Sequence, residues 1–204
     1  MHTYKKILSY LGFGVLMIGG YILKDYHTHR LYQEDIATKV LRFHVVANSD
    51  GREDQLLKLK VRDAVGSYMA PKMKEACDRK ACEKIVTESI PDIIDTAEEV
   101  IRTEGYDYSV TAKLEQTDFP VKTYGSYTFP KGEYEALNVV IGEGEGHNWW
   151  CVMYPNMCFS GSVYEVVDEN AKECLERALT QEEYESLMED KNYEVRFKYL
   201  SFLN

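Results

Sequence analysis

A ten-residue stretch, GEGEGHNWWC at positions 142–151, holds the residues of this sequence whose types and spacing could do chemistry. It includes His147 and Cys151, and a Cys-His pair is the minimal arrangement for a thiol nucleophile with its base. Such a pair must lie within hydrogen-bond reach, whereas residues four apart on an extended chain are about 13 Å apart. The spacing therefore does not predict a dyad, and we expect no catalytic residues.

The glycines of this stretch could instead suggest a phosphate-binding loop. Gly142, Gly144 and Gly146 follow a G-x-G-x-G pattern, which differs from the G-x-G-x-x-G and P-loop patterns. Glu143 and Glu145 would place negative charge where a phosphate would bind, and two carboxylates fall short of a calcium ligand set. We expect a flexible, solvated loop, with no cofactor, no metal and no small-molecule substrate.

The five cysteines do not predict a metal centre either. Cys77 and Cys82, like Cys151 and Cys158, depart from C-x-x-C spacing and lack a histidine pair, and Cys174 stands alone. Cys151 and Cys158 flank a Tyr-Pro-Asn turn signal that could bring their sulfurs together. A disulfide between these two residues and two free thiols are both open.

The two tryptophans favour a binding surface over a catalytic site. Adjacent residues on a strand point to opposite faces, so Trp149 and Trp150 cannot both enter one core. Tryptophan is enriched at interface hot spots, although helices on both faces could also bury both rings. The predicted contact surface comprises Asn148, Trp149 or Trp150, Tyr154, Gly144 and Gly146.

Composition and charge restrict the class of partner. The 204-residue chain has 45% hydrophobic and 28% charged residues, values typical of a globular domain. Its net charge is −10, and its basic residues are scattered. Such a surface repels phosphate backbones, so nucleic acid is not expected as a partner.

The N-terminus predicts contact with a membrane. Lys5 and Lys6 precede an apolar run from Ile7 to Leu23, which as a helix would be about 26 Å long. This length and charge pattern fit either a signal peptide or an uncleaved anchor. We therefore predict a signal or anchor at 1–26, a polar stalk at 27–40, and one extracytoplasmic domain at 41–204.

Periodicity within that domain predicts an α+β fold. A capping signal at Ser49 or Asp50, the latter with capping-box spacing to Glu53, starts one helix. Pro91 is expected to kink or divide the next helix, and Gly105 suits its C-terminal cap. Thr180 and Glu183 have capping-box spacing before the last helix, and His44 is expected to be a hydrogen-bonded structural histidine. This order of elements favours a mostly antiparallel sheet with packed helices. Strands are predicted at 41–47, 106–115, 121–129, 134–141, 149–153 and 194–203, and helices after residue 50 and at 81–104, 168–179 and 180–191.

Four long motifs resemble one known family. They are RFHVVANSDGREDQLLKLKVRDAV at 42–65, FPVKTYG at 119–125, FPKGEYEALNVVIGEGEG at 129–146 and NWWCVMYPNMCF at 148–159. In this order they resemble stage II sporulation protein R of endospore-forming bacteria. The resemblance covers most of residues 41–159. The N-terminal run and the segment after Phe159 resemble the family only in their general type of sequence.

The resemblance implies a signalling protein that is made in the forespore and exported into the space facing the mother cell. There it would trigger a membrane-embedded aspartic protease in the opposing membrane, which removes the pro-sequence of sigma-E. The family pattern does not require His147, which weakens the Cys-His interpretation further. It also often has proline where this chain has Asn156.

A cell-wall-binding or cell-wall-hydrolysing protein is the alternative. Exposed aromatic residues beside carboxylates suit sugar stacking, and Glu133 and Glu135 would point to the same face of one strand. Such a pair could serve acid and base roles in glycoside hydrolysis.

Overall fold

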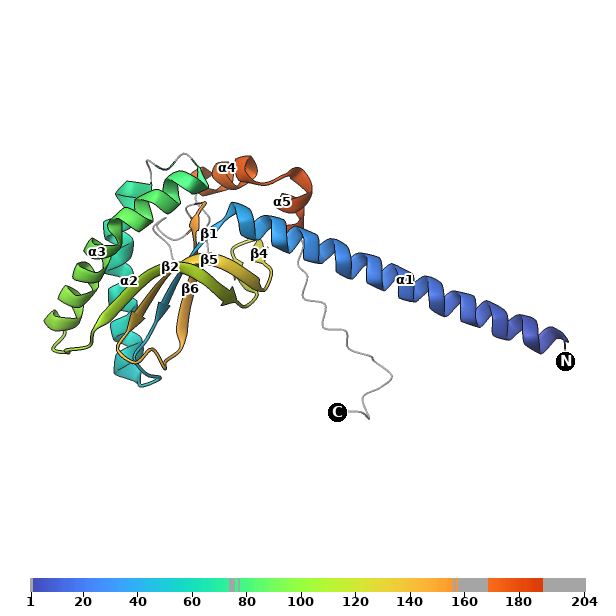
Figure 1. Ribbon diagram of the computed structural model, residues 1–204, viewed down its shortest axis with the longest axis horizontal. Helices are drawn as coiled ribbons and strands as arrows, with labels where there is room; N and C mark the ends of the chain where they lie inside the picture. The colour runs from blue at the N-terminus through green and yellow to red at the C-terminus, as the bar shows by residue number, and fades with distance from the viewer. Residues whose placement is uncertain (1, 74–75, 77, 156, 158–168, 189–204) are drawn as a thin grey trace.

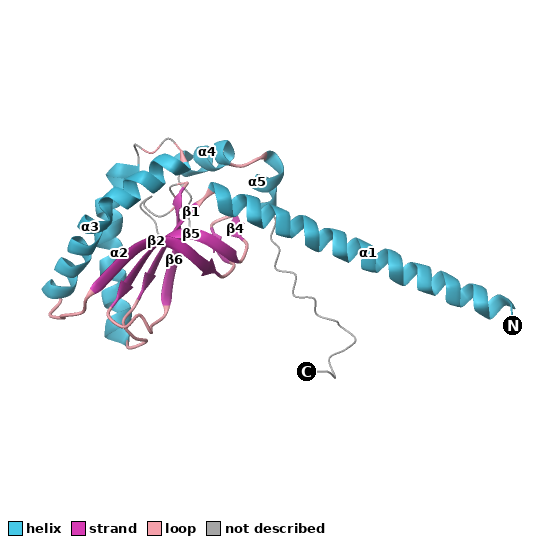
Figure 2. Ribbon diagram, viewed as in Figure 1, coloured by secondary structure: helices cyan, strands magenta, loops and turns pink. Residues whose placement is uncertain are grey.

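The fold combines a four-stranded sheet with helices and a separate two-stranded hairpin (Figures 1 and 2). The computed structural model describes residues 2–73, 76, 78–155, 157 and 169–188. The helices are α1 (His2–Lys39), α2 (Arg52–Met73), α3 (Arg79–Thr103), α4 (Glu169–Ala178) and α5 (Gln181–Met188). The strands are β1 (Leu41–Val46), β2 (Val110–Phe119), β3 (Lys122–Tyr124), β4 (Tyr127–Phe129), β5 (Gly132–Ile141) and β6 (Asn148–Tyr154).

The main sheet has the order β2-β5-β1-β6. β2 pairs with β5 and β1 pairs with β6 in antiparallel fashion, whereas the two central strands, β1 and β5, run parallel. The prediction of a mostly antiparallel sheet therefore needs correction to a mixed sheet. The parallel pair arises because α2, α3 and β2 separate β1 from β5 along the chain, and parallel neighbours require such a long connection.

Helices α2 and α3 cover one face of this sheet, as Figure 1 shows. All six residues of β1 are buried, and the covered face contributes Phe43 and Val45 to the core. Val61, Val65 and Ile93 pack into that core from the two helices. This burial of apolar surface is the main stabilisation of the fold.

Several local predictions are confirmed and others are wrong. Gly105 adopts a positive φ of 87° after α3, and Tyr106 N–H donates to the Ile101 carbonyl, which closes a C-terminal cap. Thr180 and Glu183 form the reciprocal bonds of a capping box before α5. The sequence predicts that Pro91 kinks or divides its helix, and of these two outcomes the division is wrong, because α3 is continuous through Pro91.

The strand predicted at 121–129 is instead a hairpin of two three-residue strands, β3 and β4. Gly125 turns the chain between them with a φ of 58°. The strand predicted to begin at Tyr106 begins at Val110, and the strand predicted at 194–203 lies outside the described residues.

Helix α1 projects from the domain toward the N-terminus (Figure 1). Its last turns belong to the fold, because Ile36 is only 1% exposed and Lys39 Nζ binds both carboxylate oxygens of Glu183 at 2.6 and 2.7 Å. The segment predicted to be a polar stalk thus continues into a packed helix. Among the described helices, none combines the length and apolarity needed to cross a membrane.

Candidate interaction surface

The two tryptophans lie on opposite faces of the sheet, as the sequence predicts. Trp149 is 7% exposed on the helix-covered face, where its ring meets Phe43 edge-on at 5.4 Å and Arg62 of α2 lies over it at 5.1 Å. Trp150 is half-buried on the other face and stacks on His44 at 4.0 Å with an interplanar angle of 6°. Trp149 is therefore a core residue, and Trp150 is the one that a partner could contact.

The face that carries Trp150 is called the open face below. According to the strand register, every second residue of each of the four strands lies on this face. Thr111, Lys113, Glu115 and Asn148 are exposed there, and Val140 is half-buried. The other members are Arg42, His44, Val46, Ala136, Asn138, Trp150 and Val152.

One end of the open face closes around Arg42, which is fully buried. The guanidinium lies 4.4 Å from the ring centre of Phe119 and 5.2 Å from that of Phe129, and Tyr124 and Tyr134 complete an aromatic cage. Its Nε donates to the Cys151 carbonyl at 3.0 Å. Burial lowers the pKa of Arg42, and cation–π attraction offsets part of the desolvation cost. The cage fastens the β3–β4 hairpin onto the sheet.

His44, the next residue on this face, is also buried, with 4% exposure. Burial lowers its pKa to about 4, although the neighbouring Asn148 side chain and Glu115 charge oppose the shift. The ring is therefore neutral at neutral pH. The Asn148 side chain lies near enough to favour the protonated ring, but within the described residues neither ring nitrogen has a partner at normal hydrogen-bond geometry. The expectation of a hydrogen-bonded structural histidine therefore needs correction.

Unpartnered polar atoms gather on this one face. Asn138, the register partner of His44, donates to Glu115 Oε1 at 2.8 Å, but its own Oδ1 is buried without a partner. In the described part of the chain, every buried side-chain polar atom that lacks a hydrogen bond belongs to Arg42, His44 or Asn138. Each such atom costs about 1–3 kcal/mol and calls for an explanation. A bound partner or solvent would supply the missing bonds of His44 and Asn138, whereas Arg42 Nη1 is enclosed by the aromatic cage.

Beside the open face, two loops form one cluster, called the two-loop rim below: residues 47–51 after β1 and 142–147 after β5. Because the two strands are parallel, their carboxyl ends lie at the same edge of the sheet. Gly146 N–H donates to the Ala47 carbonyl at 3.0 Å, Glu145 N–H to the Asn48 carbonyl at 3.1 Å, and Glu143 N–H to Asn48 Oδ1 at 3.0 Å. The glycine loop is thus held firmly and is not the free loop expected from sequence.

The glycines allow this close contact between the loops. Gly142 and Gly144 have positive φ values of 56° and 68°. A Cβ at Gly144 would lie 2.5 Å from Val140 Cγ1, and one at Gly146 would lie 2.2 Å from the Ser49 carbonyl oxygen. The G-x-G-x-G pattern is therefore explained by packing, and the loop N–H groups already bonded to residues 47–50 cannot cradle a phosphate.

We expect Gly146→Ala to destabilise the protein by about 2 kcal/mol, because the new methyl group meets backbone that cannot rotate away. Urea unfolding measures the change. Glu145→Ala is the matched control, because the Glu145 side chain is exposed and its backbone bond is kept. Equal stability of Gly146→Ala and the control would contradict the packing account.

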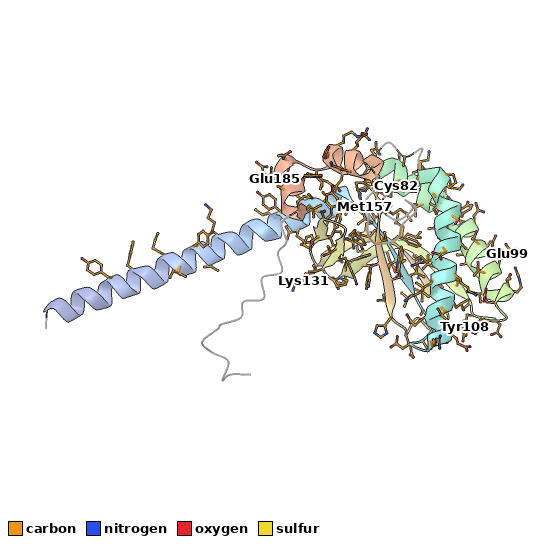
Figure 3. The ribbon with its side chains drawn as sticks, turned by 180° about the vertical axis from the view of Figure 1, so that it is seen from behind. Cys82, Glu99, Tyr108, Lys131, Met157 and Glu185 are labelled. Carbon is orange, nitrogen blue, oxygen red and sulfur yellow. The ribbon has the colours of Figure 1, made fainter. Side chains whose placement is uncertain are left out.

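Buried polar side chains of α2 form hydrogen bonds to both loops of the two-loop rim. Asp54 accepts hydrogen bonds from Ser49 Oγ at 2.6 Å and Asn48 Nδ2 at 2.8 Å, and these bonds lower its pKa. Lys58 donates to the His147 carbonyl at 2.9 Å. Tyr108, near the start of α2 in Figure 3, adds a further bond to Asp54. These bonds within the chain fix the shape of the rim.

His147 and Cys151 do not form a dyad. The His147 ring is 79% exposed and contacts Asp50 through Nδ1, so Asp50 serves this contact instead of the predicted capping box. Cys151 is buried and disulfide-bonded. Its predicted partner, Cys158, lies outside the described residues.

The predicted contact residues fall into separate groups. Asn148, Trp150 and the glycine loop lie at one end of β6, whereas Tyr154 lies at the other end, about 20 Å along the strand. Burial raises the pKa of Tyr154, which lines a pocket of about 480 Å³ together with Lys39 and Arg79. Tyr154 is thus not part of the surface around Trp150.

Sequence reasoning missed Arg42 and Asn138 as members of this surface. Both are polar residues inside strands of strongly apolar character, and that contrast is the signal that could have identified them. The two carboxylates of the alternative, cell-wall interpretation have different surroundings. Glu135 forms an ion pair with Arg79, whereas Glu133 is exposed. In the described part of the chain, no group of three or more potential ligands could hold a metal ion.

Comparison with known proteins gives the family. Residues 37–164 match the family described as stage II sporulation protein R. The chain is 36% identical over 124 residues to stage II sporulation protein R of Bacillus subtilis strain 168, covering 61% of this chain and 55% of that relative. The match thus spans little more than half the relative's length. No solved structure matches. The chain belongs to the stage II sporulation protein R family, which supports a role in sporulation and signalling.

Proposed function

We propose that this chain is an exported sporulation signal whose folded domain binds the extracytoplasmic part of a membrane-embedded aspartic protease in the opposing membrane. Binding favours the active state of the protease, which then removes the pro-sequence of sigma-E in the mother cell. The chain acts as the activator and not as the enzyme. One observation carries the proposal: Trp150 and the unpartnered polar atoms share one face of the sheet, beside the two-loop rim.

The open face has the chemistry of a docking surface. Trp150 offers a large flat ring at low cost in conformational entropy, and the exposed Asn148 lies two residues away on the same strand and face. Small rotations of the Trp150 ring would uncover His44, whose nitrogens then gain partners. The gain is large because these groups are already desolvated in the free protein.

The two-loop rim would set the direction of approach. Asp50, Glu143 and Glu145 are exposed on it and make it acidic, so a basic segment of the partner is favoured beside the open face. The bonds within the rim fix its shape before binding, which reduces the entropy lost on association.

Activation requires a difference in affinity between two states of the protease. A coupling free energy of about 1–3 kcal/mol, or a preference of about 5- to 150-fold, is typical. One stacked tryptophan and one or two hydrogen bonds to buried groups can supply a coupling free energy of this size.

Export and membrane attachment are part of the proposal. The outer half of α1 exposes apolar side chains that contact no other part of the described chain (Figure 3). They are Tyr10, Phe13, Leu16, Met17, Ile18, Tyr21 and Leu23. Apolar surface of this extent suits lipid or the translocation machinery better than water. We propose that residues 1–26 serve as a signal or anchor that places residues 41–204 in the intermembrane space.

Reconstitution tests the function directly. The protease and its sigma-factor substrate are placed in vesicles, and the full chain is added on the side opposite the substrate. We expect processing that depends on the added chain. Processing at the same rate without the chain would contradict the proposal, as would cleavage of purified cell wall by the chain that is lost in Glu133→Gln.

Within that assay, we expect Trp150→Ala to reduce the rate of processing by at least about ten-fold, because hot-spot truncation costs about 2 kcal/mol or more. Leu56→Ala is the control, since Leu56 is an exposed apolar residue on α2. Circular dichroism establishes that both variants are folded. Full activity of a folded Trp150→Ala variant would place the docking surface elsewhere.

A further inference from the structure

In the part of the chain that the structure describes, no strand pairs with the outer edge of the sheet at β2. Gly142 N–H donates to the Ser109 carbonyl at 2.8 Å, so these residues form a hydrogen-bonded pair in line with the β2–β5 register. Such pairs alternate in an antiparallel ladder. The intervening residues therefore direct their backbone N–H and C=O groups away from β5. They are Val110, Ala112, Leu114, Gln116 and Asp118.

Proteins usually protect such an edge by shortness, proline, a β-bulge or charged side chains, and of these β2 has only the charged side chains. β2 is ten residues long, keeps an unbroken register with β5 and contains no proline. Lys113, Glu115 and Gln116 are exposed along it. Among the described residues, no hydrogen bond joins this outer edge to another segment.

The opposite edge of the sheet, at β6, differs. Tyr124 Oη donates to the Trp150 carbonyl at 2.9 Å, and Met157 N–H donates to the Val152 carbonyl at 3.2 Å. The hairpin and the turn after β6 thus occupy carbonyl groups at that edge. β2 is the edge with a continuous row of donors and acceptors for another strand.

The charges of β2 match a second copy of β2. If two copies pair antiparallel with Leu114 opposite Leu114, their outward-pointing backbone groups oppose each other along the strand. Lys113 of each copy then lies opposite Glu115 of the other. A pairing centred on Lys113 or on Glu115 would instead place like charges opposite each other, which destabilises a sheet.

We propose that two copies of this chain associate through β2, centred on Leu114, so that two four-stranded sheets join into one continuous sheet. The twofold axis is perpendicular to the sheet, as in isologous pairing of identical strands. Both open faces then lie on the same side of the dimer. The inference goes beyond the proposed function and does not depend on the identity of the receptor.

The net charge of −10 on each copy opposes association, and the Lys113–Glu115 pairs are exposed and individually weak. Backbone hydrogen bonds supply affinity, and the side-chain pairs set the register. We therefore expect a reversible dimer that tightens when salt screens the repulsion.

The test uses charge reversal on the full chain in detergent micelles, with the dimer constant measured by analytical ultracentrifugation. We expect Lys113→Glu and Glu115→Lys each to weaken the dimer by about ten-fold or more, because each places like charges opposite each other twice. An equimolar mixture of the two variants should form a heterodimer of wild-type strength, since each Glu then faces a Lys.

A second variant tests the backbone contribution. Gln116→Pro removes an N–H group that points away from β5, so the ladder within the domain is kept while the dimer is lost. Gln116→Ala is the control and should dimerise normally. A wild-type chain that stays monomeric, a dimer insensitive to charge reversal, or failure of the mixture to recover would overturn the proposal. A monomer whose β2 edge binds an extended segment of the receptor would likewise overturn it.

Discussion

Arg42→Ala is expected to destabilise the protein by about 2–5 kcal/mol. The substitution empties a site lined by four aromatic rings, and it leaves the Cys151 carbonyl without its Nε donor. The β3–β4 hairpin loses its attachment to the sheet as a result. Urea unfolding monitored by circular dichroism measures the loss.

Arg42→Met separates packing from charge. Methionine fills much of the same space and removes a buried cation that pairs with no carboxylate among the described residues. We therefore expect the free energy of unfolding of Arg42→Met to lie within about 1.5 kcal/mol of the wild-type value. If Arg42→Met were as unstable as Arg42→Ala, the charge itself would stabilise the fold, and the packing account of the cage would be wrong.

Stability should also depend on pH through His44. Its pKa is about 4 in the folded protein and about 6.5 in the unfolded chain. Above pH 6.5 the ring is neutral in both states and contributes no pH dependence. As pH falls from 6.5 to 4, only the unfolded chain binds the proton, so the free energy of unfolding decreases by about 3 kcal/mol.

Comparison with His44→Phe isolates this effect. The phenyl ring keeps the stacking on Trp150 but cannot bind a proton. Other groups with lowered pKa values, such as Asp54, contribute equally to both proteins. We expect the difference in unfolding free energy between variant and wild type to grow as pH falls from 7 to 4. A constant difference would show that His44 takes up its proton in the folded state.

Features governed by neighbouring residues could be predicted from the sequence. The alternating apolar residues of β1 and β5, the cap at Gly105 and the capping box at Thr180 all depend on short-range spacing. The opposite orientation of Trp149 and Trp150 follows from strand geometry alone. These predictions hold because the tertiary structure agrees with the local preference.

Features governed by long-range packing could not be predicted. The residue pattern within β1 and β5 does not indicate that the two strands pair in parallel. Their relative direction depends on the long connection between them, which contains α2, α3 and β2. Pro91 stays within α3 because the helix on either side packs into the core at Val86 and Ile93. Asp50 looks like a helix cap in sequence, but His147 occupies it from 97 positions away.

The candidate site shows the same division. Asn148 and one of the two tryptophans could be selected from residue type and strand alternation. The choice of Trp150 depends on which face of the sheet the helices cover. The cage around Arg42 depends on Phe119, Phe129 and Tyr134, which come from three separate strands. The role of Gly146 depends on the Ser49 carbonyl of another loop. Neither contact can be predicted from the periodicity of neighbouring residues.

The open face around Trp150 is the proposed surface of contact with the receptor. The most direct measurement is binding of Asn148→Arg to vesicles that contain the protease, beside Thr87→Arg as the control. Both positions are exposed, but Asn148 lies on the open face and Thr87 lies on α3. The account predicts at least about ten-fold weaker binding for Asn148→Arg and unchanged binding for Thr87→Arg. Equal affinity of the two folded variants would contradict it.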